Sequence, residues 1–133
     1  MAQRHTLYLL LVASALVFQA CRAAPIYNPR VAFSARDPNA VEQAILKGLA
    51  NRQWLARQER PGVIVGTLNI RDHQAVIRIE YTATSYSIRY ADSKALMYQR
   101  KPNGEEVIHR NYNGWVKNLV HDINATLGVP TES

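Results

Sequence analysis

The fold is decided by Val63–Thr82, which reads VIVGTLNIRDHQAVIRIEYT. From Gln74 onward the side chains alternate in two sets, Ala75, Ile77, Ile79 and Tyr81 against Val76, Arg78, Glu80 and Thr82. Alternation with a period of two is typical of a β-strand that buries one face. The first part is rich in β-branched residues and predicts another strand, with Ile64, Leu68 and Ile70 on one face. A turn at Arg71-Asp72-His73 joins the two, so the stretch predicts the centre of an antiparallel sheet.

More strands are expected on either side of this hairpin. Arg60-Pro61-Gly62 predicts a turn before it, and Pro102-Asn103-Gly104 predicts a hairpin turn after it. The additional strands predicted around these turns are Trp54–Glu59, Tyr86–Tyr90, Leu96–Lys101 and Glu106–Arg110.

A first helix is expected over 38–52. Asp37-Pro38 is typical of a helix start, because a capping carboxylate is followed by proline at the first helical position. An apolar stripe follows beside Gly48, which permits the close approach of a neighbouring element. The stripe consists of Val41, Ile45 and Leu49.

A second helix is expected over 111–127. Asn111 is a candidate cap at its start, and Gly128 and Pro130 end it. Its apolar stripe consists of Trp115, Leu119, Ile123 and Leu127, reinforced by Tyr112, Val116 and Val120.

These elements predict an α+β fold. Two amphipathic helices and strands with one apolar face are best buried as a two-layer sandwich, with both helices on one face of an antiparallel meander of four to six strands. We expect this single domain over 37–133. Its predicted core consists of Val41, Ile45, Leu49, Ile64, Leu68, Ile77, Ile79, Ile88, Trp115, Leu119 and Ile123.

The chain begins with a basic segment, an apolar run of twelve residues and its only cysteine, Cys21. As a helix the run, Leu7–Phe18, covers roughly 18 Å, which is too short for a hydrocarbon core of about 30 Å. The layout is typical of an export signal, so we predict a lipoprotein signal peptide over 1–20 and acylation of Cys21, for example with palmitate. Cleavage after Ala23, which leaves no lipid anchor, is the alternative.

Residues 21–36 are expected to form a tether, because Pro25 and Pro29 punctuate a run of small and polar residues. A short extended piece is predicted within it at Arg30–Phe33. Arg22 stands where an inner-membrane retention signal would favour Asp. We therefore expect the periplasmic face of the outer membrane, with a soluble periplasmic protein as the alternative.

The chain carries a formal net charge of +6. A basic protein favours anionic partners, and export excludes nucleic acid as a natural one. Besides the membrane, reached through the N-terminal lipid, the expected partners are an envelope protein, a glycan or an anionic lipid headgroup. The basic residues form no run longer than two, so the charge also agrees with simple solvation.

Two segments carry a resemblance to a known family. They are Tyr81–Ser93, which contains the letters SYSIRY, and His109–Trp115, which reads HRNYNGW. The chain resembles a family of small, uncharacterised lipoproteins of Gram-negative bacteria from the helix at Val41 to the end of the last helix. The resemblance implies an acylated cysteine and a small α+β domain, and it supplies no reaction, cofactor or ligand.

Catalytic and metal-binding patterns are weak in this sequence. The histidines after the signal, His73, His109 and His121, lack a second ligand at helical spacing, so we expect no metal site and no cofactor. No nucleophile elbow and no phosphate-binding loop is present. The alternative function, a hydrolase or transferase acting on envelope polymer, would have to use Asp92, His109 or Glu80.

The leading hypothesis is a non-catalytic binding or structural module that uses the open face of its sheet. The predicted binding face consists of Arg78, Glu80, Ser87, Arg89 and Asp92. Arginine suits an anionic group, and the tyrosines beside it suit stacking. The competing interpretation is structural: Tyr86, Ile88 and Tyr90 in the core, Glu80 ion-paired with Arg78 or across strands with Arg89, and Asp92 tying a turn.

Overall fold

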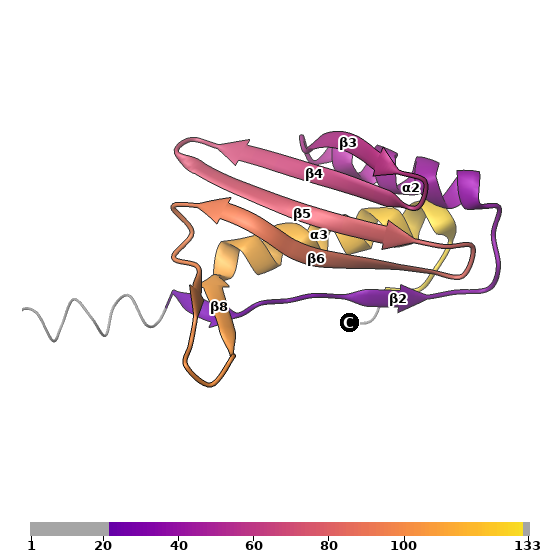
Figure 1. Ribbon diagram of the computed structural model, residues 1–133. Coiled ribbons are helices and arrows are strands. Elements are labelled where there is room, and N and C mark those ends of the chain that lie inside the picture. The colour runs from indigo at the N-terminus through magenta and orange to yellow at the C-terminus, as the bar shows by residue number, and fades with distance from the viewer. Residues whose placement is uncertain (1–21, 132–133) are drawn as a thin grey trace, which may run out of the picture.

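The computed structural model describes residues 22–131; the predicted signal peptide and Cys21 lie outside this range. The elements are β1 (Ala23–Pro25), β2 (Arg30–Ala32), α2 (Pro38–Asn51), β3 (Leu55–Arg60), β4 (Val63–Ile70), β5 (His73–Tyr81), β6 (Ser85–Lys94), β7 (Gln99–Arg100), β8 (Glu106–His109) and α3 (Arg110–Leu127) (Figure 1).

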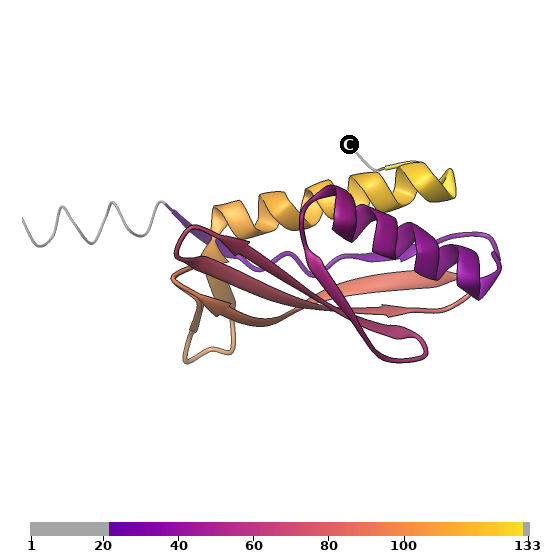
Figure 2. The ribbon, with the colours of Figure 1, turned by 90° about the horizontal axis from the view of Figure 1, so that it is seen from above.

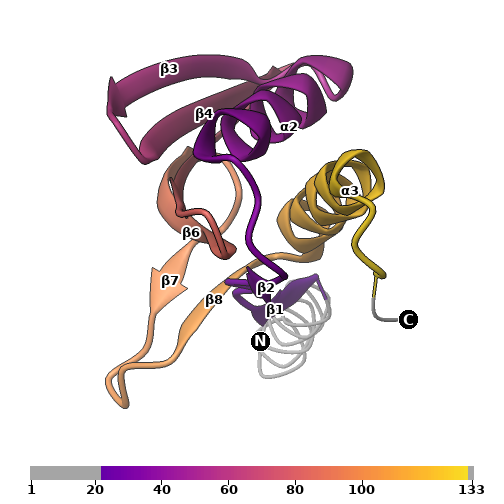
Figure 3. The ribbon, with the colours of Figure 1, turned by 90° about the vertical axis from the view of Figure 1, so that its right-hand side faces the viewer.

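The predicted hairpin is the centre of a five-stranded antiparallel sheet with the order β2-β6-β5-β4-β3. Four of these strands form the expected meander, and β2 adds to its β6 edge. Ile79 lies between Ile64 and Ile88 in the register, and all three side chains are buried. Both helices lie on one side of this sheet (Figure 2), as the end-on view also shows (Figure 3). The α+β fold with both helices on one face is therefore confirmed.

The core lies between the helices and the inner face of the sheet. Ten of the eleven predicted core residues are buried in it. The exception is Trp115, which is half-buried. The apolar stripe of α3 is centred on Val116, Leu119 and Ile123, so Trp115 falls on its flank. At Gly48 the two helices meet closely, because a Cβ atom there would lie 2.9 Å from Cγ1 of Ile123.

The second hairpin does not extend the meander. β7 and β8 instead form a separate three-stranded sheet of order β1-β8-β7 at one end of the domain. The loop from Ala95 to Tyr98 turns the chain away from the main sheet, with Ala95 and Met97 both at positive φ. Non-glycine residues rarely adopt this backbone conformation, so the turn could not be predicted from the sequence.

The predicted tether also differs in the structure, because residues 22–36 lie along the domain. β1 pairs with β8, and β2, which falls within the predicted extended piece, pairs with β6. Between them the Asn113 side chain donates to the Pro25 carbonyl (2.9 Å) and accepts from the Tyr27 amide (3.0 Å). Strands of three residues are too short to show a hydrophobic period, which is why their pairing was not visible in the sequence.

Both helices begin at a residue whose side chain accepts a hydrogen bond from a backbone amide of the first turn. Asp37 caps α2 as predicted, accepting from the Asn39 amide at 2.9 Å. α3 begins one residue earlier than expected, and its cap is His109 rather than Asn111: the His109 Nδ1 accepts from the Asn111 amide at 3.1 Å. Neither helix in the described part of the chain combines the length and hydropathy needed to cross a membrane.

Candidate functional site

The face of the five-stranded sheet opposite the helices carries a row of arginines. Register places Arg57 of β3 beside Val65, Val65 beside Arg78, and Arg78 beside Arg89. Arg57, Arg78 and Arg89 are hereafter called the arginine row. Neighbouring strands lie about 4.8 Å apart, so the row presents guanidinium groups along one line across the sheet.

A second line of polar residues runs beside this row. Glu80 is in register with Ser87, and Ser87 with Arg30 of β2; at the other end Arg60 is in register with Val63. These residues surround a shallow hollow of about 280 Å³. The hollow is lined by Arg30, Arg60, Pro61, Gly62, Val63, Glu80, Tyr81, Thr82, Ser85 and Ser87.

In the described part of the chain, carboxylates form ion pairs with only one arginine of the row. Arg78 forms ion pairs with Glu59 and, at 3.5 Å, with Glu80. The Arg78–Glu80 pair is thus as predicted, whereas the alternative pairing of Glu80 with Arg89 does not occur. Arg57 and Arg89 make no ion pair with any residue in 22–131.

Positive charge therefore predominates in and around the two lines. Five arginines lie there against two glutamates: Arg30, Arg57, Arg60, Arg78 and Arg89 against Glu59 and Glu80.

Asp92 lies farther along the same face. It is in register with Val76, across a β-bulge from the Arg78–Arg89 pair. Its Oδ1 accepts from the Ser93 amide at 2.8 Å, so one carboxylate oxygen is held by the backbone. The structure thus brings four of the five predicted face residues into two adjacent lines and leaves Asp92 beside them.

The tyrosines of β6 belong to the core side. Tyr86 is fully buried and donates to Asn124 Oδ1 at 2.7 Å, and burial raises its pKa far above the usual range. Tyr90 is half-buried, with its ring stacked on Tyr98 (4.3 Å between centroids) and edge-on to Tyr112 (5.8 Å). The structural interpretation of these rings is correct, so they are not part of the outward face.

The histidines have local structural partners. His109 caps α3, and burial, followed by the positive charges of Arg22 and Arg110, lowers its pKa, which favours the neutral acceptor form. His73 Nδ1 lies 2.8 Å from the Ala95 carbonyl, and His121 contacts Asp122. Among residues 22–131 no group of three metal-ligating side chains is assembled, and no carboxylate bonds to His109.

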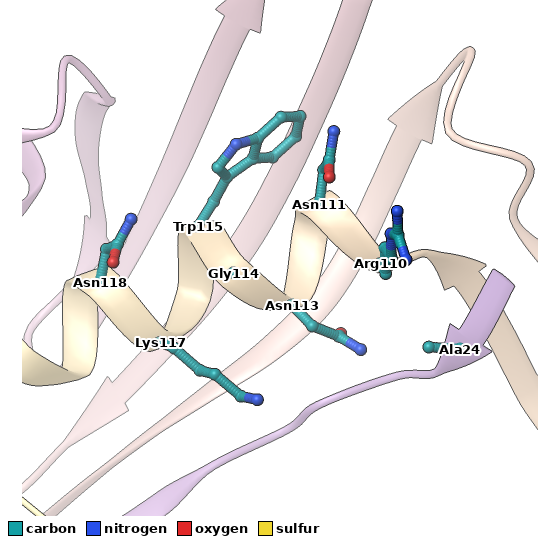
Figure 4. Close-up of a pocket in the computed structure, with 8 residues that line it drawn as sticks. All are labelled: Ala24, Arg110, Asn111, Asn113, Gly114, Trp115, Lys117 and Asn118. Carbon is teal, nitrogen blue, oxygen red and sulfur yellow. The ribbon is translucent and has the colours of Figure 1, made fainter. Parts of the chain in front are cut away.

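A larger hollow of about 490 Å³ lies along the first turns of α3 (Figure 4). Its side chains splay to opposite sides of the helix, with Trp115 and Asn118 on one side and Asn113 and Lys117 on the other. Asn113 already clamps the N-terminal segment through the Pro25 and Tyr27 backbone. We therefore regard this hollow as open surface without converging polar groups.

Sequence reasoning missed three arginines of the positive face, Arg30, Arg57 and Arg60. Arg30 lay in the predicted tether, and β3 is exposed at all six positions, so it shows no hydrophobic alternation from which to assign a face. Only the register of β2 and β3 against their neighbours reveals them.

A scan of family models, a search of curated proteins and a search of solved structures each found no match for the chain. The likeness to lipoproteins of Gram-negative bacteria therefore stays a prediction. Its two segments pack together in the fold, since Tyr90 of the first contacts Tyr112 of the second.

Proposed function

We propose that this chain is an envelope lipoprotein, acylated at Cys21 and held at the periplasmic face of the outer membrane. Its domain is a non-catalytic module that binds an anionic group through the positive sheet face. The observation that supports this function most is the arginine row, which lies on a face that no helix covers within residues 22–131.

The geometry suits recognition of several acidic groups in line. A guanidinium presents a planar fork of donors that matches a carboxylate or phosphate. Glu59 and Glu80 hold Arg78 in place, while Arg57 and Arg89 on either side keep their donors available to a ligand. An acidic envelope protein, an anionic glycan or a lipid headgroup each supplies such groups.

The binding face is tested by crosslinking and pull-down from intact envelopes. The variant is Arg57→Ser/Arg89→Ser, which leaves both ion pairs of Arg78 intact. The control, Lys47→Ser/Lys117→Ser, removes the same charge from exposed positions on the helices. We expect the double arginine variant to lose partners that the control retains; equal recovery from both would refute the sheet-face function.

The anchor is tested separately by fractionation. Wild type is expected in the membrane fraction with the mass of attached acyl chains, and Cys21→Ser in the soluble periplasm. If both proteins are soluble and neither carries acyl mass, the lipoprotein assignment is wrong.

A further inference from the structure

Exposed apolar side chains gather at one end of the domain. Four large hydrophobic residues in 22–131 are exposed, and three of them are Ile70 (36%), Met97 (39%) and Tyr98 (39%). Ile70 ends β4 at the β4–β5 turn, and the other two lie in the β6–β7 loop. His73 joins the turn to the loop, because its Nδ1 lies 2.8 Å from the Ala95 carbonyl. We call Ile70, Met97 and Tyr98 the apolar end patch.

The chain enters the domain at the same end. The Arg22 carbonyl accepts from the Arg110 amide at 2.9 Å, and Ala23 is in register with His109. The His109 amide in turn donates to the carbonyl of Leu96, the residue before Met97, at 2.8 Å. Figure 1 shows β1, the β4–β5 turn and the β6–β7 loop at the same end of the domain, opposite the β5–β6 turn.

Very little chain separates the proposed anchor from the domain. Cys21 directly precedes Arg22, and β1 begins at Ala23. One peptide step spans about 3.8 Å, so a lipid on Cys21 would hold the end patch against the bilayer.

We propose that the apolar end patch docks on the bilayer surface, a proposal that rests on the lipid anchor proposed above. The anchor brings the patch to the membrane, and the patch then fixes the orientation of the domain. The occupant is the interfacial layer of the membrane, where aromatic side chains with an apolar body and a polar tip are favoured.

Charge around the patch agrees with a membrane surface. Segments 70–73 and 94–110 contain five basic residues against three acidic ones: Arg71, Lys94, Arg100, Lys101 and Arg110 against Asp72, Glu105 and Glu106. An apolar patch surrounded by an excess of basic residues suits a bilayer that contains anionic lipid.

The loop holds its apolar residues outward at a conformational cost. Ala95 (φ 57°) and Met97 (φ 55°) both adopt the left-handed region, which costs a non-glycine residue free energy. Tyr98 is stacked on Tyr90, with the two rings 14° from parallel, and this contact fixes the orientation of the Tyr98 ring. These restraints hold Met97 and Tyr98 in their exposed positions.

The proposal is tested on the acylated mature protein, purified in detergent from membranes and reconstituted into vesicles of phosphatidylethanolamine and phosphatidylglycerol. Because Cys21 is the only cysteine and would carry the lipid, Met97→Cys gives a single site for an environment-sensitive fluorophore. A second label at Ile70→Cys repeats the measurement from the other side of the patch. The control is Thr84→Cys, an exposed position in the β5–β6 turn at the opposite end.

We expect labels at 97 and 70 to shift to shorter emission wavelength and to be quenched by lipids carrying a quencher on their acyl chains. The label at 84 should show neither effect. If the protein is bound to vesicles but all three labels behave alike, docking is refuted while the anchor stands. If the protein carries no acyl chain and does not bind vesicles, both proposals fail.

Discussion

Truncation of Leu119 tests whether α3 is seated on the sheet as described. Leu119 lies in the middle of the α3 stripe and is completely buried. Leu119→Ala removes three carbon atoms, and at about 0.8 kcal/mol for each buried carbon the lost transfer free energy is about 2.4 kcal/mol. The cavity left behind adds to this, so we expect a loss of unfolding free energy of about 2 to 5 kcal/mol.

The assay is urea unfolding of the variant and wild type, with the slope against urea compared to ensure that one transition is measured. Leu55→Ala provides a matched control, because the same atoms are removed from a side chain that is 67% exposed. The control should lose no more than about 1 kcal/mol, the span of strand propensities. A loss below about 0.5 kcal/mol for Leu119→Ala would place this residue outside the core and refute the helix packing.

Three further changes test local features of the structure. Gly48→Ala should lower the free energy of unfolding in urea by up to about 2 kcal/mol, because the clash of the new methyl group with Ile123 outweighs the gain in helix propensity. Unchanged stability would show that the Ile123 side chain can move aside without cost. The folded state holds the pKa of His109 below its unfolded value, so wild type should lose stability as the pH falls below about 6.5 and the unfolded chain takes up a proton. His109→Asn keeps a capping side chain and should lose less stability over this pH range. An unchanged pH profile would contradict this. Arg52→Met removes the two hydrogen bonds to Asp122 (2.8 and 3.0 Å), which lower the pKa of that carboxyl. In urea unfolding below about pH 4, wild type should therefore lose more stability than the variant, because the wild-type advantage depends on an ionised Asp122; parallel pH profiles would contradict this.

Periodic patterns predicted the parts of the fold that bury one face over several residues. β5 alternates over its nine residues and β4 is rich in β-branched residues, and the bounds of both agree with the prediction to within one residue. α2 was equally visible, because Asp37 and Pro38 mark its start and its stripe repeats every four residues. Such elements are predictable because the local residue pattern and the need to bury one face agree along their whole length.

Elements that depend on distant partners were not predictable in this way. β1 and β2 have three residues each and exist because β8 and β6 offer unpaired backbone groups. The sequence around Pro25 and Pro29 therefore resembled a linker. His109 was overlooked as a cap for a related reason, since Asn111 is the more common capping residue and only the backbone geometry shows which residue precedes the first turn.

The candidate face was predictable only one strand at a time. Arg78 and Glu80 follow from the alternation in β5, and Arg89 from that in β6. Their meeting side by side depends on the register between the strands, which the β-bulge opposite Val76 and Ile77 shifts. A one-residue slip would turn every second side chain to the core, so residues on separate strands become one site only when the pairing is known.

The N-terminal segment links the two proposals. Pairing of β1 with β8 and the Asn113 clamp on Tyr27 attach residues 23–27 firmly to the domain, so an anchor at Cys21 would act on a rigid body. The strands of the main sheet run from the anchored end towards the β5–β6 turn. With the apolar end patch on the bilayer, these strands would point away from the membrane. The arginine row on their open face would then face the aqueous compartment, roughly parallel to the membrane plane. Docking at the end and binding at the face therefore use different surfaces and can operate at the same time.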